Sequence, residues 1–92
     1  MKILYFNSFL RNFKDLPIDK RSEIERIITH LITCLEGKIQ PSKGLGLKKL
    51  KEDFWEIRLG LDLRIVFTIE PGTLNLLFVG SHDKIKRYLK TL

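Results

Sequence analysis

The chain has 92 residues, 43% of them hydrophobic, with 17 basic and 11 acidic residues and a single cysteine. This length suits one domain over residues 1–92. The lone Cys34 excludes an internal disulfide framework and fits a reducing compartment. The apolar start is too short for a signal sequence and no stretch could span a bilayer, so we expect a cytoplasmic protein with no membrane contact. The net charge of +6 favours a polyanionic partner such as nucleic acid.

The first part of the chain predicts a strand followed by a short helix. Residues 2–6 form a brief apolar run, which is typical of a buried strand. Asn7 or Ser8 can cap a helix after it. That helix is expected to end at Leu16-Pro17, because the residue before a proline is pushed out of the helical region.

A longer helix follows, with Asp19 as its N-cap candidate. Apolar residues then recur at helical spacing and form a stripe along one face: Ile24, Ile27, Ile28, Leu31, Ile32 and Leu35. Gly37 stands where a glycine commonly ends a helix. Turn residues over 38–46 predict a loop.

The second half of the chain alternates apolar and polar side chains, as strands do. A strand pattern begins over residues 47–51. In residues 55–59 the apolar side chains share one face, and Glu56 and Arg58 share the other. Residues 63–69 repeat this pattern, with Arg64 on the polar face.

Two turns and a basic tail complete the chain. Residues 60–62 form the first turn. Residues 70–73 place Pro71 and Gly72 at the positions that a type II turn prefers. Residues 74–79 form a last, almost wholly apolar strand. Ser81 or Asp83 can cap a short basic helix after it.

The predicted fold is α+β, in the order β-α-α-β-β-β with a short basic C-terminal helical tail. A two-helix hairpin packs on one face of a mostly antiparallel four-stranded sheet. The face toward the long helix is expected to carry Trp55, Ile57, Ile65, Phe67 and Phe78. The opposite face displays Glu56, Arg58, Arg64 and Thr68, as a solvated face or as a working surface.

Three motifs stand out in the second half of the chain. They are W-E-I-R-L at 55–59, L-R-I-V-F at 63–67, and V-G-S-H-D at 79–83 ahead of a basic tail with Tyr88. With the order of elements, they resemble the RelE-like branch of the RelE/ParE superfamily of toxin–antitoxin toxins. The resemblance implies an endoribonuclease (an mRNA interferase), often acting on mRNA at the ribosome and neutralised by a cognate antitoxin. It implies no metal or other cofactor, because the 2′-hydroxyl attacks the adjacent phosphorus and leaves a 2′,3′-cyclic phosphate.

The resemblance also implies roles for single residues. Arg64 corresponds to the sheet arginine that stabilises the phosphate, and Arg58 to a basic position on the neighbouring strand. Glu56 stands where RelE has a lysine and other members use a glutamate base. His82 stands where RelE has an arginine and related toxins have a catalytic histidine. Tyr88 corresponds to a C-terminal tyrosine that contacts the nucleotide.

RNA transesterification requires a base, an acid and positive charge beside the phosphorane. Histidine and glutamate can carry protons, whereas arginine is a fixed phosphate clamp. The predicted catalytic residues are Glu56, Arg64, His82 and Tyr88. We assign Glu56 as the base and His82 as the acid, and the reverse assignment stays open. The predicted RNA-binding residues are Lys48, Lys49, Lys51, Arg58, Lys84, Lys86 and Arg87. The two histidines and one cysteine are too widely separated for a metal site.

Other interpretations fit the same residues. Glu56 and Arg58 can be solvated strand residues that pair across the sheet. His82 can be an ordinary loop histidine, and Tyr88 can pack its ring against the sheet edge. The alternative functions are a ParE-like gyrase inhibitor that does no chemistry and a non-catalytic nucleic-acid-binding module. His82 and Tyr88 favour the nuclease.

Overall fold

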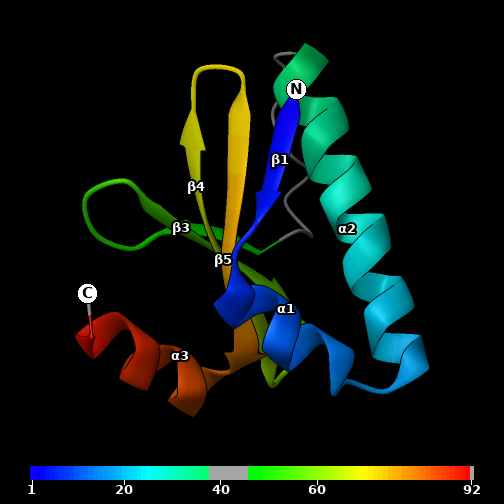
Figure 1. The fold of residues 1–92 in the computed structure, drawn as a ribbon, viewed down its shortest axis with the longest axis vertical. Coiled ribbons are helices and arrows are strands. Elements are labelled where there is room, and N and C mark those ends of the chain that lie inside the picture. Colours follow the sequence, from blue (N-terminus) through cyan, green and yellow to red (C-terminus); the bar gives the residue numbers. More distant parts are fainter. Residues whose placement is uncertain (38–45, 92) are drawn as a thin grey trace.

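The computed structural model describes residues 1–37 and 46–91. The loop predicted over 38–46 therefore lies, except for Gly46, outside the described residues. The elements, in chain order, are β1 (Lys2–Tyr5), α1 (Asn7–Lys14), α2 (Ile18–Gly37), β2 (Leu47–Lys49), β3 (Phe54–Leu59), β4 (Leu63–Glu70), β5 (Thr73–Ser81) and α3 (His82–Lys90) (Figure 1).

The strands form one five-stranded sheet in the order β1-β5-β4-β3-β2. β1 pairs with β5 in parallel, and the other neighbours are antiparallel. The α+β class is confirmed, but the predicted four-stranded sheet is wrong in strand number. The fifth strand is β2, in which the first residues of the strand pattern at 47–51 pair with β3 at the edge of the sheet. The sheet is mixed because β1 runs parallel to β5 at one edge, while α1 and α2 carry the chain from β1 to β2 at the opposite edge.

The main core lies between the sheet and the helices α1 and α2. The apolar stripe of α2 buries Ile24, Ile28 and Leu31 against this face. Phe9 joins them from α1, and its ring stacks on that of Phe13. The sheet contributes side chains from three strands, namely Ile57, Leu59, Ile65, Phe67, Leu74, Leu76 and Val79. The predicted packing of the long helix is thereby confirmed for the strands β3 and β4.

A bulge in the β4–β5 ladder moves one predicted core residue to the other face. Val66 pairs with Phe78, whereas its neighbour Phe67 pairs with Leu76, so Leu77 is the extra residue. An extra residue reverses the alternation of side chains beyond it. Phe78 was expected to face the long helix. It lies instead on the opposite face, in the cluster around Val66.

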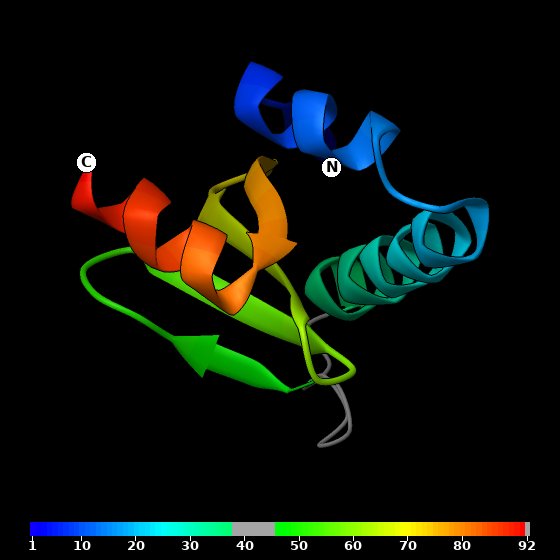
Figure 2. The ribbon, with the colours of Figure 1, turned by 90° about the horizontal axis from the view of Figure 1, so that it is seen from below.

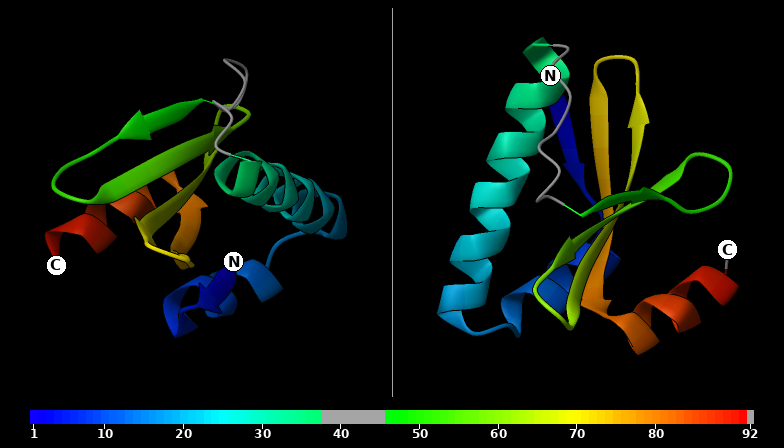
Figure 3. Two further views of the ribbon diagram at one scale, coloured as in Figure 1. Left: turned by 90° about the horizontal axis from the view of Figure 1, so that it is seen from above. Right: turned by 180° about the vertical axis from the view of Figure 1, so that it is seen from behind.

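The helix α3 covers part of this opposite face and makes a second, smaller core. Val66, Leu77 and Ile85 are buried there, and five partly buried side chains pack around them: Leu50, Phe54, Phe78, Tyr88 and Leu89. The helices α2 and α3 therefore lie on opposite sides of the sheet (Figures 2 and 3). The basic tail is thus a packed layer of the fold.

The helix starts differ in part from the prediction. α1 begins at Asn7 and has Phe6 at its N-cap, with no side-chain cap. Ser8 instead donates its hydroxyl hydrogen bond to the Leu77 carbonyl, which ties α1 to β5. α2 begins directly after Pro17, so that Asp19 lies in its first turn. Ser81 caps α3 as predicted and accepts from the Lys84 N–H at 3.3 Å. None of the helices in the described ranges is long and apolar enough to cross a bilayer.

Candidate functional site

A buried ion pair occupies the middle of the sheet face that α3 partly covers. Glu56 of β3 accepts a hydrogen bond of 2.6 Å at Oε1 from Nη1 of Arg64 on β4. Glu56 is only 5% exposed. Its cross-strand partner is Val66, so Arg64 reaches it diagonally from two positions along β4. The sheet register thereby brings together two of the predicted catalytic residues.

Further positive charges surround this pair. Arg58 lies directly opposite Arg64, and Lys48 of β2 lies directly opposite Glu56. Both side chains are exposed. Two arginines facing each other across a ladder repel, and one carboxylate offsets only part of their charge. The exposed side of the ion pair therefore favours an anion.

Arg64 keeps hydrogen-bonding capacity for such an anion. A guanidinium has five N–H donors, and one of them is used by Glu56. Arg64 Nε is buried and has no hydrogen-bond partner. The side chain as a whole is 14% exposed, and the donors of a guanidinium that a carboxylate fixes on one side can bind a phosphate oxygen. Glu56 fixes the Arg64 guanidinium in place. Its carboxylate can therefore act as a base only after the hydrogen bond to Arg64 breaks.

His82 is the first residue of α3, two residues beyond Gly80, which pairs with Arg64. Its side chain is exposed. At 100° per residue, His82 and Lys86 lie on one side of α3, while Lys84 and Arg87 lie on the other. α3 lies between the β2–β3 hairpin and α1 (Figures 2 and 3). The predicted catalytic and basic residues of this segment are therefore divided between two sides of one helix.

Tyr88 packs on Phe78. The two rings are nearly parallel, with their centroids 4.6 Å apart and an interplanar angle of 19°. In the free protein the tyrosine ring thus lies against the sheet, as the alternative interpretation held. Gly80 makes room for this stack, because a Cβ at position 80 would lie 3.0 Å from Phe78 Cε1.

Phe78 is also shared by two surface hollows. One, of about 360 Å³, is lined by Phe78, Lys84, Arg87, Tyr88 and Thr91. The other, of about 290 Å³, is lined by Ser8, Arg11, Asn12 and Phe78. Neither Phe78 nor the α1 residues could be assigned to a site from the sequence, because nothing in the alternation of β5 signals the bulge.

The basic residues of the β2–β3 segment do not act as one cluster. Lys48 shares the face of Glu56. Lys49 points to the other face, where its Nζ lies 5.8 Å from the centroid of the Trp55 ring. Lys51 is exposed in the connection between the two strands. Among these three lysines, only Lys48 is placed by a register partner beside the ion pair.

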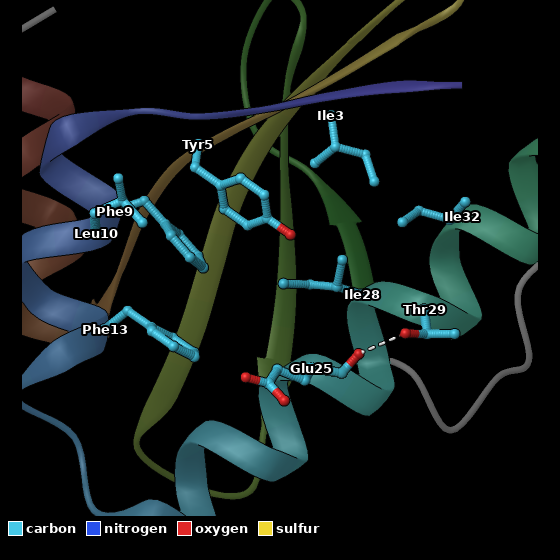
Figure 4. A pocket seen from close by; sticks show the side chains of 9 residues that line it. All are labelled: Ile3, Tyr5, Phe9, Leu10, Phe13, Glu25, Ile28, Thr29 and Ile32. Carbon is cyan, nitrogen blue, oxygen red and sulfur yellow. Dashed lines mark hydrogen bonds between the residues drawn. The ribbon is translucent and has the colours of Figure 1, made fainter.

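A larger apolar hollow lies on the other side of the sheet, between β1, α1 and α2 (Figure 4). Its volume is about 510 Å³, and its lining is mostly aliphatic and aromatic, with Glu25 and Thr29 as polar members. None of the predicted site residues reaches it. Within the described ranges, no three histidine, cysteine, aspartate or glutamate side chains gather in a way that could hold a metal ion.

Solved structures provide the comparison for this arrangement. No protein-family model matches the chain, and no curated protein sequence matches it either. A chain of the RelB–RelE antitoxin–toxin complex from Methanococcus jannaschii has a TM-score of 0.71 and 24% identity, over 92% of this chain and 96% of that chain. A copper-bound mutant toxin from Helicobacter pylori has a TM-score of 0.67 and 23% identity, over 91% and 97%. A chain of the intact RelBE toxin–antitoxin complex from E. coli has a TM-score of 0.63 and 17% identity, over 87% and 94%.

These likenesses extend over almost the whole chain and establish its fold. The protein has the fold found in structures of RelE-type toxins and their complexes. The resemblance predicted from the second-half motifs is confirmed at this level.

Proposed function

We propose that this protein is the toxin of a toxin–antitoxin pair and that it cleaves RNA by attack of a 2′-hydroxyl on the adjacent phosphorus. The observation that carries the proposal is the Glu56–Arg64 ion pair, which holds a partly unsatisfied guanidinium on a face with surplus positive charge. The fold shared with RelE-type toxins supports the same reaction. The neighbouring cations Lys48 and Arg58 would bind flanking phosphates.

In the proposed reaction, Arg64 binds a non-bridging oxygen of the scissile phosphate. This oxygen competes with Glu56 for the guanidinium and releases the carboxylate to take the proton of the 2′-hydroxyl. The 2′-oxygen bonds to phosphorus, and the bond from phosphorus to the 5′-oxygen breaks. His82 gives a proton to the departing 5′-oxygen, and Arg64 stabilises the charge of the phosphorane. Each step uses groups of this chain alone and requires no metal.

The remaining predicted residues bind RNA in this proposal. Tyr88 presents an aromatic ring beside Lys84 and Arg87, and aromatic rings flanked by cations are a common platform for unpaired bases. Lys49, Lys51 and Lys86 add long-range attraction to the phosphate backbone. Cytoplasmic mRNA, free or on the ribosome, is the substrate class.

The partner in this proposal is an antitoxin protein. The apolar hollow between β1, α1 and α2 offers a surface for an apolar segment of such a partner. Large hydrophobic side chains around β1 and α1 are exposed by 40–47%, namely Leu4, Tyr5, Phe6 and Leu10. A contiguous apolar surface of this kind usually marks a protein contact.

The test is cleavage of an mRNA, free and ribosome-bound, by the purified protein in the presence of EDTA. We expect cleavage that leaves a 2′,3′-cyclic phosphate, and no cut at a position where a single 2′-deoxynucleotide replaces the ribonucleotide. Gyrase supercoiling is measured beside it. Inhibited gyrase with intact RNA would establish the ParE-like alternative, and RNA binding without either activity would establish the non-catalytic module.

A further inference from the structure

We infer that the groove between α1 and α3, with Phe78 at its floor, is a second RNA subsite that binds an unpaired nucleotide flanking the cleaved phosphate. The inference rests on the proposed function for its substrate, and extends it to residues on α1. The groove consists of the two hollows that share Phe78. One wall is Ser8, Arg11 and Asn12, and the other is Lys84, Arg87 and Thr91.

The walls are held in place by contacts to β5. Ser8 of α1 donates to the Leu77 carbonyl, one residue before the floor. Tyr88 of α3 stacks on one face of the Phe78 ring. Phe78 is half-buried and also borders the hollow on the α1 side. The groove is therefore preformed, and a ligand need not order its walls.

Both walls are positively charged. The cations that line the groove are Arg11 on α1, with Lys84 and Arg87 on α3, and all three are exposed. None of the salt bridges in residues 1–37 and 46–91 involves any of these three. Asp83 lies four residues before Arg87, but it is exposed and pairs with no cation in this part of the chain. The groove thus has unpaired positive charge on two sides of an aromatic floor.

The combination favours a nucleotide over an acidic peptide. An acidic peptide requires only the cations, whereas a nucleotide also uses the face of an aromatic ring. Asn12 adds a group suited to the edge of a base. Its Nδ2 donates to the Ser8 carbonyl at 3.1 Å, which leaves its Oδ1 without a partner among the described hydrogen bonds.

The groove also lies within reach of the proposed reaction centre. Arg64 pairs with Gly80 across the ladder, and Phe78 is two residues from Gly80 on the same strand. Strand spacing and rise place the α-carbons of Arg64 and Phe78 roughly 8 Å apart. One strand of RNA can therefore bind Arg64 by its scissile phosphate and extend a neighbouring base over α3 to the groove.

The experiment measures binding of a fluorescent 2′-O-methyl oligonucleotide of about six nucleotides, which covers a single-strand site and cannot be cleaved because it lacks a free 2′-hydroxyl. Salt titrations compare the parent chain with Arg11→Gln, which removes one positive charge from the α1 wall. Each lost phosphate contact should lower the slope of log affinity against log salt concentration by about 0.7. Between 50 and 200 mM salt, the variant should therefore lose affinity by a factor about threefold smaller than the parent chain does. Arg26→Gln is the matched control, because Arg26 is an exposed arginine on α2 that lines neither hollow of the groove.

A second arm separates base from phosphate. An oligonucleotide of the same length without bases should bind the parent chain at least about fivefold more weakly, because stacking contributes to every bound base. Phe78→Leu keeps an apolar side chain and should remove most of this difference. Thermal unfolding of each variant excludes loss of fold as the cause.

The outcomes are distinct from those of the cleavage assay. A protein that binds through Arg11 and prefers bases but never cuts RNA would overturn the proposed function and leave the groove standing. Cleavage with an Arg11→Gln salt slope equal to that of the parent would overturn the groove alone. Equal binding of the oligonucleotides with and without bases would reduce the groove to a simple polyanion patch and would also overturn the inference.

Discussion

The carboxylate of Glu56 and the guanidinium of Arg64 form a direct ion pair of 2.6 Å, in which the two side chains are only 6% and 14% exposed. A pair so far from water is costly to break by removal of one partner. Its place, in the centre of a sheet face rather than at an edge, links the stability of the fold to the proposed chemistry. Stability and activity should therefore respond differently to replacement of one partner and of both.

Either Glu56→Ala or Arg64→Ala should lower the free energy of unfolding by about 3–5 kcal/mol, since each leaves a buried charge without its partner. The double variant Glu56→Leu/Arg64→Met should be about as stable as the parent but inactive. Urea unfolding of the four proteins measures the coupling. The control is the exposed Lys20–Glu23 pair on α2, 3.8 Å apart, whose loss should cost less than about 1 kcal/mol. Additive losses at positions 56 and 64 would contradict a coupled pair.

Replacement of His82 should change the shape of the pH–rate profile as well as the rate. In the proposed mechanism His82 is the acid, and a lost acid removes one limb of a bell-shaped profile and lowers the rate by about 10²–10⁴. Arg64→Lys should lower the rate and leave the shape unchanged, because neither side chain transfers the proton. Single-turnover cleavage across pH measures both effects. His30→Gln, at an exposed position on α2, is the control; a parent-like profile for His82→Gln would assign the acid to another group.

Gly80→Ala should disturb the aromatic stack. The added methyl would lie 3.0 Å from Phe78 Cε1 and 3.3 Å from Lys84 Cβ, so the ring and α3 must both yield. Overpacking of this kind typically costs about 1–3 kcal/mol. Near-ultraviolet circular dichroism and urea unfolding measure the change. Adding Phe78→Leu to Gly80→Ala should relieve the overpacking. If the double variant is no more stable than the sum of the two single changes in unfolding free energy predicts, the glycine serves another purpose.

Much of the fold could be predicted from side-chain periodicity. The α2 stripe from Ile24 to Leu35 and the alternation in β3 and β4 each follow a regular repeat, and those elements lie where the patterns place them. The hairpin turn was also predictable, because a proline followed by a glycine suits a turn whose third residue has a positive φ. Gly72 has a φ of +73°. Local repeats identify elements well when one face of each element is buried.

The misplaced features depend on pairing between distant parts of the chain. The bulge at Leu77 has no local marker in an apolar run, and it turned Phe78 to the other face. The parallel partner of β1 is likewise a property of the whole sheet. For the site, the sequence indicated Glu56 and Arg64 by their strand positions, and the register brings them into contact. The α1 wall of the groove could not be foreseen, because a hydrogen bond from Ser8 to β5 positions it.

The parallel pairing of β1 with β5 has a consequence for protein synthesis. Lys2 pairs with Thr73 and Tyr5 with Leu76, so β1 leaves the ribosome well before the strand with which it pairs. Closure of so long a loop is slow relative to local folding. Arg64 also lacks its β5 neighbour Gly80 until then. A nascent chain therefore cannot assemble this sheet face while β5 is still inside the ribosome that is making it.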